Sequence, residues 1–310
     1  LPVDDYIGGA EHAVMHLLYA RMWVKVMQDE GLIDFNEPFI ALHNQGMILA
    51  PDGQKMSKSK GNTIEPGVLI EQGYGADAIR IMELFIGPWN QSVAWSIEGM
   101  GGSFRFLQRV WTITQEVIES SSERQEVSSN PEHAADDIEL KRTMHHAIYR
   151  VTKDLETMGF NTAVAALMET VNQLYKLRST LPIQNHRETW LWAVRTLNQL
   201  LAPFAPHITE ELWSEINNSA SVTDSTTERS ASIHTSDWPV YDDQYLVRDE
   251  ITIVVQINGK LRAQLLVASD ASEQEIMQAA HAEPKIADHL QGKTVRKSIY
   301  VPHKLVNFVL

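Results

Sequence analysis

A lysine-rich loop around residue 57 holds the side chains best suited to chemistry in this chain. It carries three lysines and two serines between two glycines, in the order Gly53, Gln54, Lys55, Met56, Ser57, Lys58, Ser59, Lys60, Gly61 and Asn62. Lysine can bring positive charge to a polyphosphate, because its ammonium is a compact charge on a long, adaptable stem. Short lysine runs also occur in solvated turns and in weak nucleic-acid patches. Taken alone, the loop leaves polyphosphate binding and a solvated turn both open.

Composition describes an ordinary globular chain with an acidic balance. The 310 residues are 44% hydrophobic and 21% charged, with a net charge of −14. This acidity disfavours an RNA partner without excluding one, because binding needs only one positive face. Residues 246–310 carry eight Lys or Arg and seven Asp or Glu, a balance of +1, so the acidic excess lies upstream.

Several features limit the class of protein. There is no cysteine, which excludes disulfides and thiolate zinc sites. No apolar run approaches the roughly 20 residues that span a bilayer, so no membrane partner is predicted. The start at Leu1 has no Met, basic region or apolar signal core, and we expect it to lie inside a longer protein.

A glycine turn and a helix are expected near the start of the chain. Gly8 and Gly9 permit close backbone approach or a positive φ, and residues 11–27 read as one helix that is apolar on more than one face. Such a helix is expected to be buried. His12 and His16 share a helix face, but no third ligand accompanies them, so no metal site is predicted. The two histidines are either hydrogen-bonded core residues or part of a polar substrate pocket.

Short apolar runs between residues 39 and 49 suit parallel strands that are buried on both faces. Pro51, Asp52 and Gly53 then provide turn chemistry. The lysine loop is therefore expected to follow sheet residues at a glycine-rich bend. Further on, Asp77 is expected to cap the helix that begins beside it.

The second half of the chain reads as helices followed by a small mixed unit. Apolar spacing predicts an up-and-down helical bundle over residues 98–216. Residues 217–245 are polar at first and are interpreted as a flexible linker.

The last 65 residues are expected to form a small α/β unit. Asn258 and Gly259 predict a type I′ hairpin turn, and Ser272 with Glu275 predicts a capping box. Six basic residues there could form one face or could be separate solvated charges: Lys260, Arg262, Lys293, Arg296, Lys297 and Lys304.

Four blocks of the sequence resemble one enzyme family in that family's own order. The loop at residues 55–59 resembles the KMSKS signature of class I aminoacyl-tRNA synthetases. The block at residues 5–21, with DYIGGAEHA at its start and HLLYAR at its end, resembles the leucyl-tRNA synthetase family. The blocks YGADAIR at residues 74–80 and LAPFAPHITEELW at residues 201–213 resemble the connector and the anticodon-domain signature. The chain is thereby identified as similar to the C-terminal portion of leucyl-tRNA synthetases.

This resemblance implies a multidomain α/β plus all-α chain. Its parts would be the second half of a Rossmann-type catalytic domain with the KMSKS loop (1–62), a stem-contact connector (63–97), a helical anticodon-binding bundle (98–216), the linker (217–245) and a small α/β tRNA-binding domain (246–310).

The resemblance also implies roles for particular residues. ATP would be bound by Gly8, Gly9, Glu11, Lys55, Met56, Ser57, Lys58 and Ser59. Leucine would be bound by Tyr6, His12 and His16. Lys55 and Lys58 would be catalytic, because their charges can stabilise the reacting triphosphate. tRNA would be bound by Lys260, Arg262, Arg296, Lys297 and Lys304.

The implied reaction is ATP-dependent activation of leucine and its transfer to tRNA(Leu), with Mg²⁺ accompanying ATP, in a cytoplasmic enzyme that is a monomer at full length. The His-Ile-Gly-His-like signature of the class and the family's Thr-rich editing domain are absent from these 310 residues. We therefore expect this chain alone neither to activate nor to edit leucine. The alternatives are an isoleucyl- or valyl-type synthetase and a non-catalytic tRNA-binding subunit.

Overall fold

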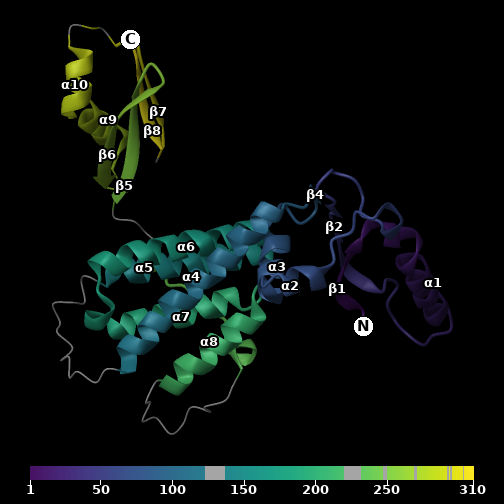
Figure 1. The fold of residues 1–310 in the computed structure, drawn as a ribbon. Helices are drawn as coiled ribbons and strands as arrows, with labels where there is room; N and C mark the ends of the chain where they lie inside the picture. The colour runs from purple at the N-terminus through teal and green to yellow at the C-terminus, as the bar shows by residue number, and fades with distance from the viewer. Residues whose placement is uncertain are drawn as a thin grey trace. The chain divides into compact units, whose positions relative to one another are not determined.

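The computed structural model describes residues 1–122, 137–219, 232–246, 250–268, 271–291, 293, 295–302 and 304–310. They form two compact units, Leu1–Tyr241 and Asp242–Leu310 (Figure 1). Each unit has its own hydrophobic core. Residues 123–136, within the range predicted for the bundle, and residues 220–231 of the expected linker lie outside the described residues.

The first unit opens with a strand that the sequence did not predict. β1 (Val3–Gly9) pairs in parallel with β2 (Phe39–Gln45), and Gly9 lies opposite Gln45. Gly9 has φ −70° and ψ 150°. The glycine pair therefore ends a strand and makes no positive-φ turn, which corrects the expected glycine turn.

The helix expected over residues 11–27 is divided and exposed. A 3₁₀ turn (Ala10–Val14) precedes α1 (His16–Asp29), because Met15 leaves the helical region at φ −118° and ψ −102°. Val24 is the only buried residue of α1. The prediction of one buried helix was wrong, because only a two-stranded sheet accompanies α1 among the described residues and it leaves most of the apolar surface open.

The strands expected to be buried on both faces are also more open than predicted. β2 alternates between half-buried and exposed residues and buries none. The short strand β3 (Ile48–Leu49) follows it and pairs in parallel with β4 (Val93–Ala94). Alternation of this kind is typical of a sheet with one covered face, and the described residues cover only one.

Two helices connect the lysine loop to the bundle, α2 (Pro66–Glu71) and α3 (Gly75–Phe85). Asp77 lies buried in α3, but it does not cap that helix, whose first turn has no side-chain cap. Its carboxylate instead accepts hydrogen bonds from the backbone N–H of Ile208 (2.7 Å) and from Nδ1 of His207 (2.8 Å). The prediction that Asp77 caps its own helix was wrong, because the terminus that it caps, at the start of α8, is about 130 residues away in sequence.

A second α3 side chain fixes the same junction. The Arg80 guanidinium donates to the carbonyl oxygens of Pro203 (2.8 Å) and Phe204 (3.1 Å). These carbonyls follow a helix end, where backbone acceptors lack partners within the helix. Asp77 and Arg80 therefore hold both sides of the turn between the last two bundle helices.

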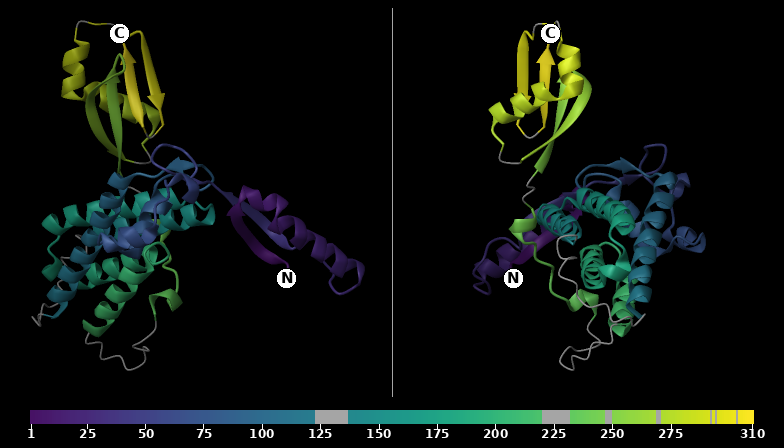
Figure 2. Two further views of the ribbon diagram at one scale, coloured as in Figure 1. Left: turned by 45° about the vertical axis from the view of Figure 1, so that its right-hand side comes forward. Right: turned by 90° about the vertical axis from the view of Figure 1, so that its left-hand side faces the viewer.

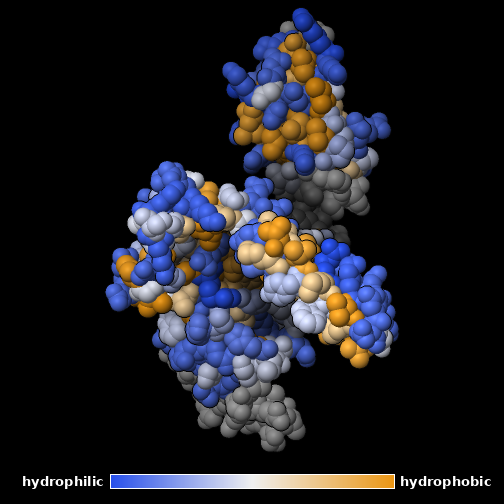
Figure 3. Space-filling model, turned by 90° about the vertical axis from the view of Figure 1, so that its right-hand side faces the viewer, coloured by the Kyte–Doolittle hydropathy of each residue, from blue (hydrophilic) through white to orange (hydrophobic). Residues whose placement is uncertain are grey.

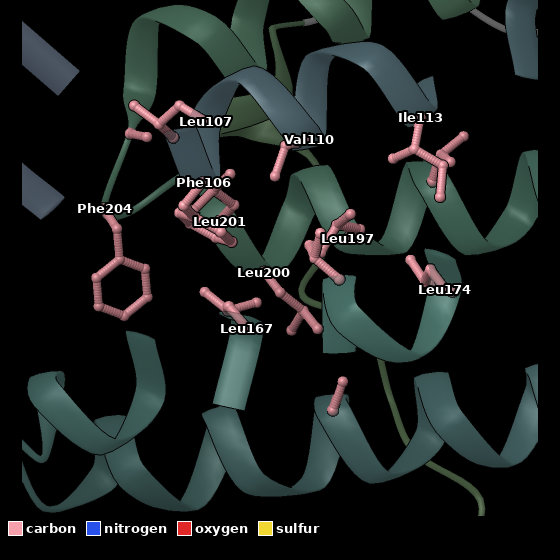
Figure 4. Packing of buried hydrophobic residues seen from close by; sticks show 14 of the residues in the cluster. Phe106, Leu107, Val110, Ile113, Leu167, Leu174, Leu197, Leu200, Leu201 and Phe204 are labelled. Carbon is pink, nitrogen blue, oxygen red and sulfur yellow. The ribbon is translucent and has the colours of Figure 1, made fainter. Parts of the chain in front are cut away.

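The predicted bundle is present as a set of packed helices (Figures 1 and 2). They are α4 (Ile97–Ser122), α5 (Ile138–Glu156), α6 (Phe160–Thr180), α7 (Arg187–Leu201) and α8 (Pro206–Ser219). Figure 4 shows side chains from several of these helices, such as Ile113, Leu174 and Leu197, meeting in one core. All three are fully buried.

Part of the expected linker packs on the bundle. Ile233 is 3% exposed, and its backbone N–H donates to the Glu210 carboxylate of α8 at 3.0 Å. The Trp238 indole N–H donates to the Thr152 hydroxyl of α5 at 2.9 Å. Residues 232–241 therefore belong structurally to the first unit.

The second unit is the small α/β unit that the sequence predicted. Its sheet has the order β6-β5-β8-β7, formed by β5 (Glu250–Ile257), β6 (Lys260–Ala268), β7 (Lys297–Val301) and β8 (Leu305–Val309). Asn258 (φ 49°) and Gly259 (φ 77°) form the expected hairpin turn, and Ser272 and Glu275 form the expected capping box of α9 (Glu273–Ala282). The sequence did not predict α10 (Pro284–Leu290). Side chains of α9 and α10 cover one face of the sheet.

Candidate functional site

The lysine loop is an ordered turn that follows β3 and is hydrogen-bonded to its end. Lys55 forms an isolated antiparallel β-bridge with Leu49 of β3. The Ala50 backbone N–H donates to the Gln54 carbonyl at 2.8 Å. Gly53 (φ 77°) and Gly61 (φ 65°) adopt left-handed conformations, which glycine reaches without steric penalty. Between them, Lys58–Lys60 form a 3₁₀ turn. The expected glycine bend is therefore confirmed.

The loop presents its reactive side chains and anchors its apolar one. Lys55 and Lys58 are exposed, and among the described residues neither ammonium group has a hydrogen-bond or ion-pair partner. The Lys60 ammonium instead donates to Gln54 Oε1 at 3.1 Å. The hydroxyls of Ser57 and Ser59 lie 2.7 Å apart, and Met56 packs against the core of the first unit.

A second group of candidate residues lies where β1 and β2 end. Gly8 and Gly9 end β1 opposite Asn44 and Gln45 of β2, and ligands of parallel sheets bind at this carboxyl edge. A methyl group added at Gly9 would collide with the Glu11 carboxylate. The Glu11 carboxylate therefore lies over the Gly9 backbone, and it would have to turn away if a side chain were added there.

The three residues proposed for leucine lie beside this edge. Tyr6 Oη is 3.0 Å from His16 Nδ1, and the two rings stack with centroids 5.4 Å apart. A Cβ added at Gly8 would lie 3.4 Å from Tyr6 and 3.9 Å from His12, so both rings flank that glycine. Nδ1 of His12 is buried without a hydrogen-bond partner among the described residues. A buried polar atom without a partner needs an explanation, and a polar ligand bound beside it would provide one.

A cavity of about 420 Å³ adjoins the same edge. Gly9 and Glu11 line it on one side, and α3 and the segment before β4 line the other. Its full lining is Gly9, Glu11, Gln45, Gly46, Met47, Ile48, Glu83, Leu84, Ile86, Gly87, Pro88, Trp89, Gln91, Val93 and Phe160. Volumes of this order accommodate small-molecule ligands.

Carboxyl groups give the cavity its electrostatic character. Burial raises the pKa of the Glu83 carboxyl, and the nearby Arg80 guanidinium lowers it in part. With Glu11 also in the wall, the cavity disfavours phosphate and suits hydroxyl or amine donors. The lysine loop has the opposite sign, and among the described residues no hydrogen bond links that loop to Gly8, Gly9 or Glu11.

Sequence reasoning missed the far wall of this cavity. A methyl group at Gly46 would collide with the Gln91 backbone carbonyl, so two segments cross there in direct contact. The Trp89 indole N–H is buried without a hydrogen-bond partner among the described residues. Its ring packs edge-to-face against the Phe160 ring, with the ring centroids 5.1 Å apart. Gly46 directly follows β2, and a glycine at such a position was the sequence signal that another backbone segment approaches closely.

The basic residues of the second unit form no single cluster. Strand alternation places Arg262 and Lys297 on the sheet face opposite α9 and α10. They lie on the two outer strands, β6 and β7, which are separated by three strand spacings, about 14 Å. Lys260 closes the hairpin at the same end of the sheet, whereas Lys304 adjoins Leu305, which pairs with Val254 farther along β5.

Apolar side chains separate these charges. Ile299 is 37% exposed and Val301 36% exposed on β7, and Figure 3 shows orange, apolar surface on this unit among blue, polar residues. The expected basic face is therefore a mixed face with basic residues near its edges. Arg296 immediately precedes β7, and its backbone N–H donates to the Val309 carbonyl at 2.8 Å, which places Arg296 near the hairpin end of the sheet.

Among the described residues, no three His, Asp or Glu side chains are grouped so that they could hold a metal ion. No helix among the described residues has the length and apolar content to cross a membrane.

Models of two protein families match separate parts of the chain. The family described as tRNA synthetases class I (I, L, M and V) matches residues 17–96. The family described as the anticodon-binding domain of tRNA ligase matches residues 137–277. The first match includes the lysine loop and most of the connector, and the second begins just before α5 of the bundle and extends to α9 of the second unit.

Curated relatives match the whole chain. A leucine–tRNA ligase of Herpetosiphon aurantiacus is 46% identical over 310 residues, which are 100% of this chain and 35% of the relative. A leucine–tRNA ligase of Deinococcus radiodurans is 41% identical over 309 residues, again 100% of this chain and 35% of the relative. The chain thus spans about a third of the length of these relatives.

Solved structures share the fold. A LeuRS of Agrobacterium radiobacter K84, in a ternary complex with tRNA and LeuAMS, has a TM-score of 0.73 at 33% identity and covers 100% of this chain and 37% of its own. A methionyl-tRNA synthetase of Mycobacterium tuberculosis has a TM-score of 0.53 at 18% identity, over 69% of this chain and 44% of its own. The resemblance and the multidomain fold class drawn from the sequence are both confirmed.

Proposed function

We propose that this chain, a relative of the class I leucine–tRNA ligases along its whole length, is the C-terminal portion of such an enzyme and carries half of its ATP site. The observation that carries this proposal is the lysine loop. Its signature residues lie on an ordered bend, with the ammonium groups of Lys55 and Lys58 exposed and unpaired among the described residues.

The proposed reaction begins with leucine and ATP. A leucine carboxylate oxygen attacks the α-phosphorus, the bond from that phosphorus to the bridging oxygen breaks, and pyrophosphate leaves. Lys58, with Lys55, neutralises charge that develops on the departing phosphates. Such a displacement depends on positioning and charge stabilisation more than on covalent help. A ribose hydroxyl at the end of tRNA(Leu) then attacks the leucyl carbonyl, and AMP leaves.

The edge of β1 is proposed to hold the nucleoside and the amino acid. Glu11 would accept hydrogen bonds from the ribose hydroxyls, with Gly8 and Gly9 allowing close approach of the sugar. Tyr6, His12 and His16 would line the leucine site. The buried, unpaired Nδ1 of His12 supports a polar ligand there.

Lys55, Met56, Ser57, Lys58 and Ser59 would contact the triphosphate from the loop. Mg²⁺ would arrive with ATP as part of the substrate, because the described residues group no three ligands for a resident ion.

The bundle and the second unit are proposed to bind tRNA(Leu). Lys260, Arg262, Arg296, Lys297 and Lys304 would contact phosphates, which positions the RNA without reading its sequence. The full-length enzyme is proposed to be a cytoplasmic monomer.

The decisive experiment is leucine-dependent exchange of pyrophosphate into ATP by the full-length protein. Lys58→Ala should lower the exchange rate about 10²–10³-fold, the loss typical of one donor to a developing anion. Lys60→Ala is the matched control from the same loop, because the Lys60 ammonium is held by Gln54. Equal rates for Lys58→Ala and the unaltered protein would remove Lys58 from the mechanism.

Two other functions predict different results. An isoleucyl- or valyl-type enzyme would activate those amino acids in preference to leucine when all three compete. A non-catalytic tRNA-binding subunit would bind tRNA and show no exchange with any of them. The leucine-specific names of the relatives favour the leucine enzyme.

A further inference from the structure

One side chain ties the lysine loop into a ring. Asn62 Oδ1 accepts a hydrogen bond from the Ser57 backbone N–H at 2.8 Å. Nδ2 of the same carboxamide donates to the Lys55 carbonyl oxygen at 3.3 Å. Two backbone groups on either side of Met56 are therefore held by a residue that follows the loop.

The chemistry of this contact selects asparagine. The carboxamide is the side-chain group that offers an acceptor and a donor side by side. Its orientation is fixed, because the Ser57 N–H needs an oxygen and the Lys55 carbonyl needs an N–H. Aspartate would keep the first bond and lose the second, and alanine would lose both.

The local fold brings Asn62 to this position. The Lys60 N–H donates to the Ser57 carbonyl at 3.1 Å, and the Gly61 N–H donates to the Lys58 carbonyl at 3.2 Å. Gly61 then reverses the chain in the left-handed conformation at φ 65°. This reversal returns Asn62 to the start of the loop, where it is half-buried.

The two lysines that the proposed reaction uses lie on either side of the tied segment. Lys55 is itself held through its carbonyl, and Lys58 begins the 3₁₀ turn next to Ser57. Neither ammonium takes part in the bonds of the ring, so both stay free for a ligand while the backbone that carries them is fixed.

We infer that Asn62 is a positioning residue for the proposed activation of leucine: its carboxamide holds the backbone of Lys55 and Ser57 so that the lysine side chains meet the triphosphate in one geometry. The inference rests on the proposed function for its chemical consequence. The ring of hydrogen bonds itself rests on the geometry alone.

The kinetic test compares Asn62→Ala with Gln54→Ala in the full-length protein. Asn62→Ala should lower kcat for leucine-dependent pyrophosphate exchange about 10-fold to 100-fold, the range for a misplaced reacting group. KM for leucine should stay within about twofold, because leucine is proposed to bind at the β1 edge, away from the loop. Gln54→Ala removes the neighbouring side-chain bond to Lys60 and should leave kcat within about twofold.

A second measurement follows the ring without relying on activity. Hydrogen exchange of the Ser57 amide should be slow in the unaltered protein and in Asn62→Asp, which keeps the acceptor, and about 10-fold or more faster in Asn62→Ala. Amides of Ile113 and Leu197 in the bundle should exchange at unchanged rates, which shows that the variants are folded.

The outcomes separate this inference from the proposed function. If the unaltered protein exchanges no pyrophosphate with leucine, isoleucine or valine, the proposed function fails. Hydrogen exchange of the Ser57 amide then tests by itself whether Asn62 holds the ring of hydrogen bonds. Unchanged Ser57 exchange in Asn62→Ala would overturn the inference. So would a fall in kcat in which the Ser57 amide remains protected.

Discussion

Two helices of nearly equal length show how differently the two ends of the first unit are built. α1 has 14 residues and buries one of them, whereas α7 has 15 residues and buries eight. Both are rich in apolar side chains: Met22 and Trp23 of α1 are more than half exposed, while Trp190 and Leu197 of α7 are fully buried. Apolar content predicted both helices, and only the supply of packing partners separates them.

The difference indicates that the bundle helices contribute more to the stability of the first unit than α1 does. α7 contacts α4, α5, α6 and α8, and burial of its apolar side chains stabilises the bundle from within. α1 packs against few described partners and contributes little burial of its own. Substitutions in the two helices should therefore have unequal effects.

Leu197→Ala and Leu18→Ala test this comparison most strongly. Leu197 is fully buried and Leu18 is 64% exposed. Leu197→Ala should destabilise the first unit by about 2–5 kcal/mol through lost burial and a residual cavity. Leu18→Ala should change the free energy of unfolding of this chain by less than about 0.5 kcal/mol. Urea unfolding measures both, and equal losses would break the comparison.

Asp77→Ala asks whether the bundle is stable without its junction to α3. The variant leaves the Ile208 N–H at the start of α8 without its acceptor. Loss of such a cap should destabilise the first unit by about 1–2 kcal/mol in thermal or urea unfolding.

Asp29→Ala is the matched control, since Asp29 is an exposed carboxylate at the end of α1. Asp77→Asn keeps one acceptor oxygen and should lose less than Asp77→Ala. A loss in Asp29→Ala as large as that in Asp77→Ala would show that charge, and not the cap, is responsible.

Ser272→Ala extends the comparison to the second unit. It removes the capping box of α9 and should destabilise that unit alone by about 1 kcal/mol. The unfolding transition of the first unit should not move, because the units have separate cores. Glu273→Gln changes a neighbouring first-turn residue outside the box and should have a smaller effect.

The capping box should also respond to acid. Hydrogen bonds from the Ser272 backbone N–H and hydroxyl hold the pKa of Glu275 below its ordinary value. A carboxyl with a lowered folded-state pKa stabilises the fold above its unfolded pKa, and this contribution is lost as pH falls through the folded value. The difference between the unaltered protein and Ser272→Ala should therefore shrink below about pH 4. A difference that is constant from pH 7 to pH 3 would contradict this account.

Glu83→Gln should have the smallest effect and the opposite sign. Burial raises the pKa of Glu83, so its ionised form is disfavoured in the folded state. The resulting penalty grows as pH rises above the ordinary glutamate pKa of about 4.3. Glu83→Gln should slightly raise the melting temperature at pH 7 and leave it unchanged near pH 3, where both side chains are neutral. A lower melting temperature at pH 7 would mean that attraction to Arg80 outweighs burial.

The sequence predicted the parts of this chain whose signals are local. Apolar spacing predicted the bundle, Asn258 and Gly259 predicted the hairpin, and Ser272 with Glu275 predicted the capping box. The lysine loop was predicted with its glycine bends. Each of these depends on residues only a few positions apart.

Features that depend on distant residues were missed or misplaced. β1 was overlooked because its strand has a polar start and two glycines at its end. Asp77 was assigned to its own helix, because nothing near it in sequence points to α8. The far wall of the cavity, with Trp89 and Phe160, joins segments 71 positions apart. The roles of the site residues remain predictions to be tested by the exchange assays.

The strand order of the second unit has a consequence for synthesis on the ribosome. β8 lies between β5 and β7 and follows the other three described strands of this sheet in the sequence. Until Leu305–Val309 emerge, the edge of β5 that β8 covers in the finished sheet stays open, and β7 has no strand to join. An open edge can pair with other chains. The nascent second unit is therefore exposed to aggregation until β8 has been translated, when the bundle before it has long been complete.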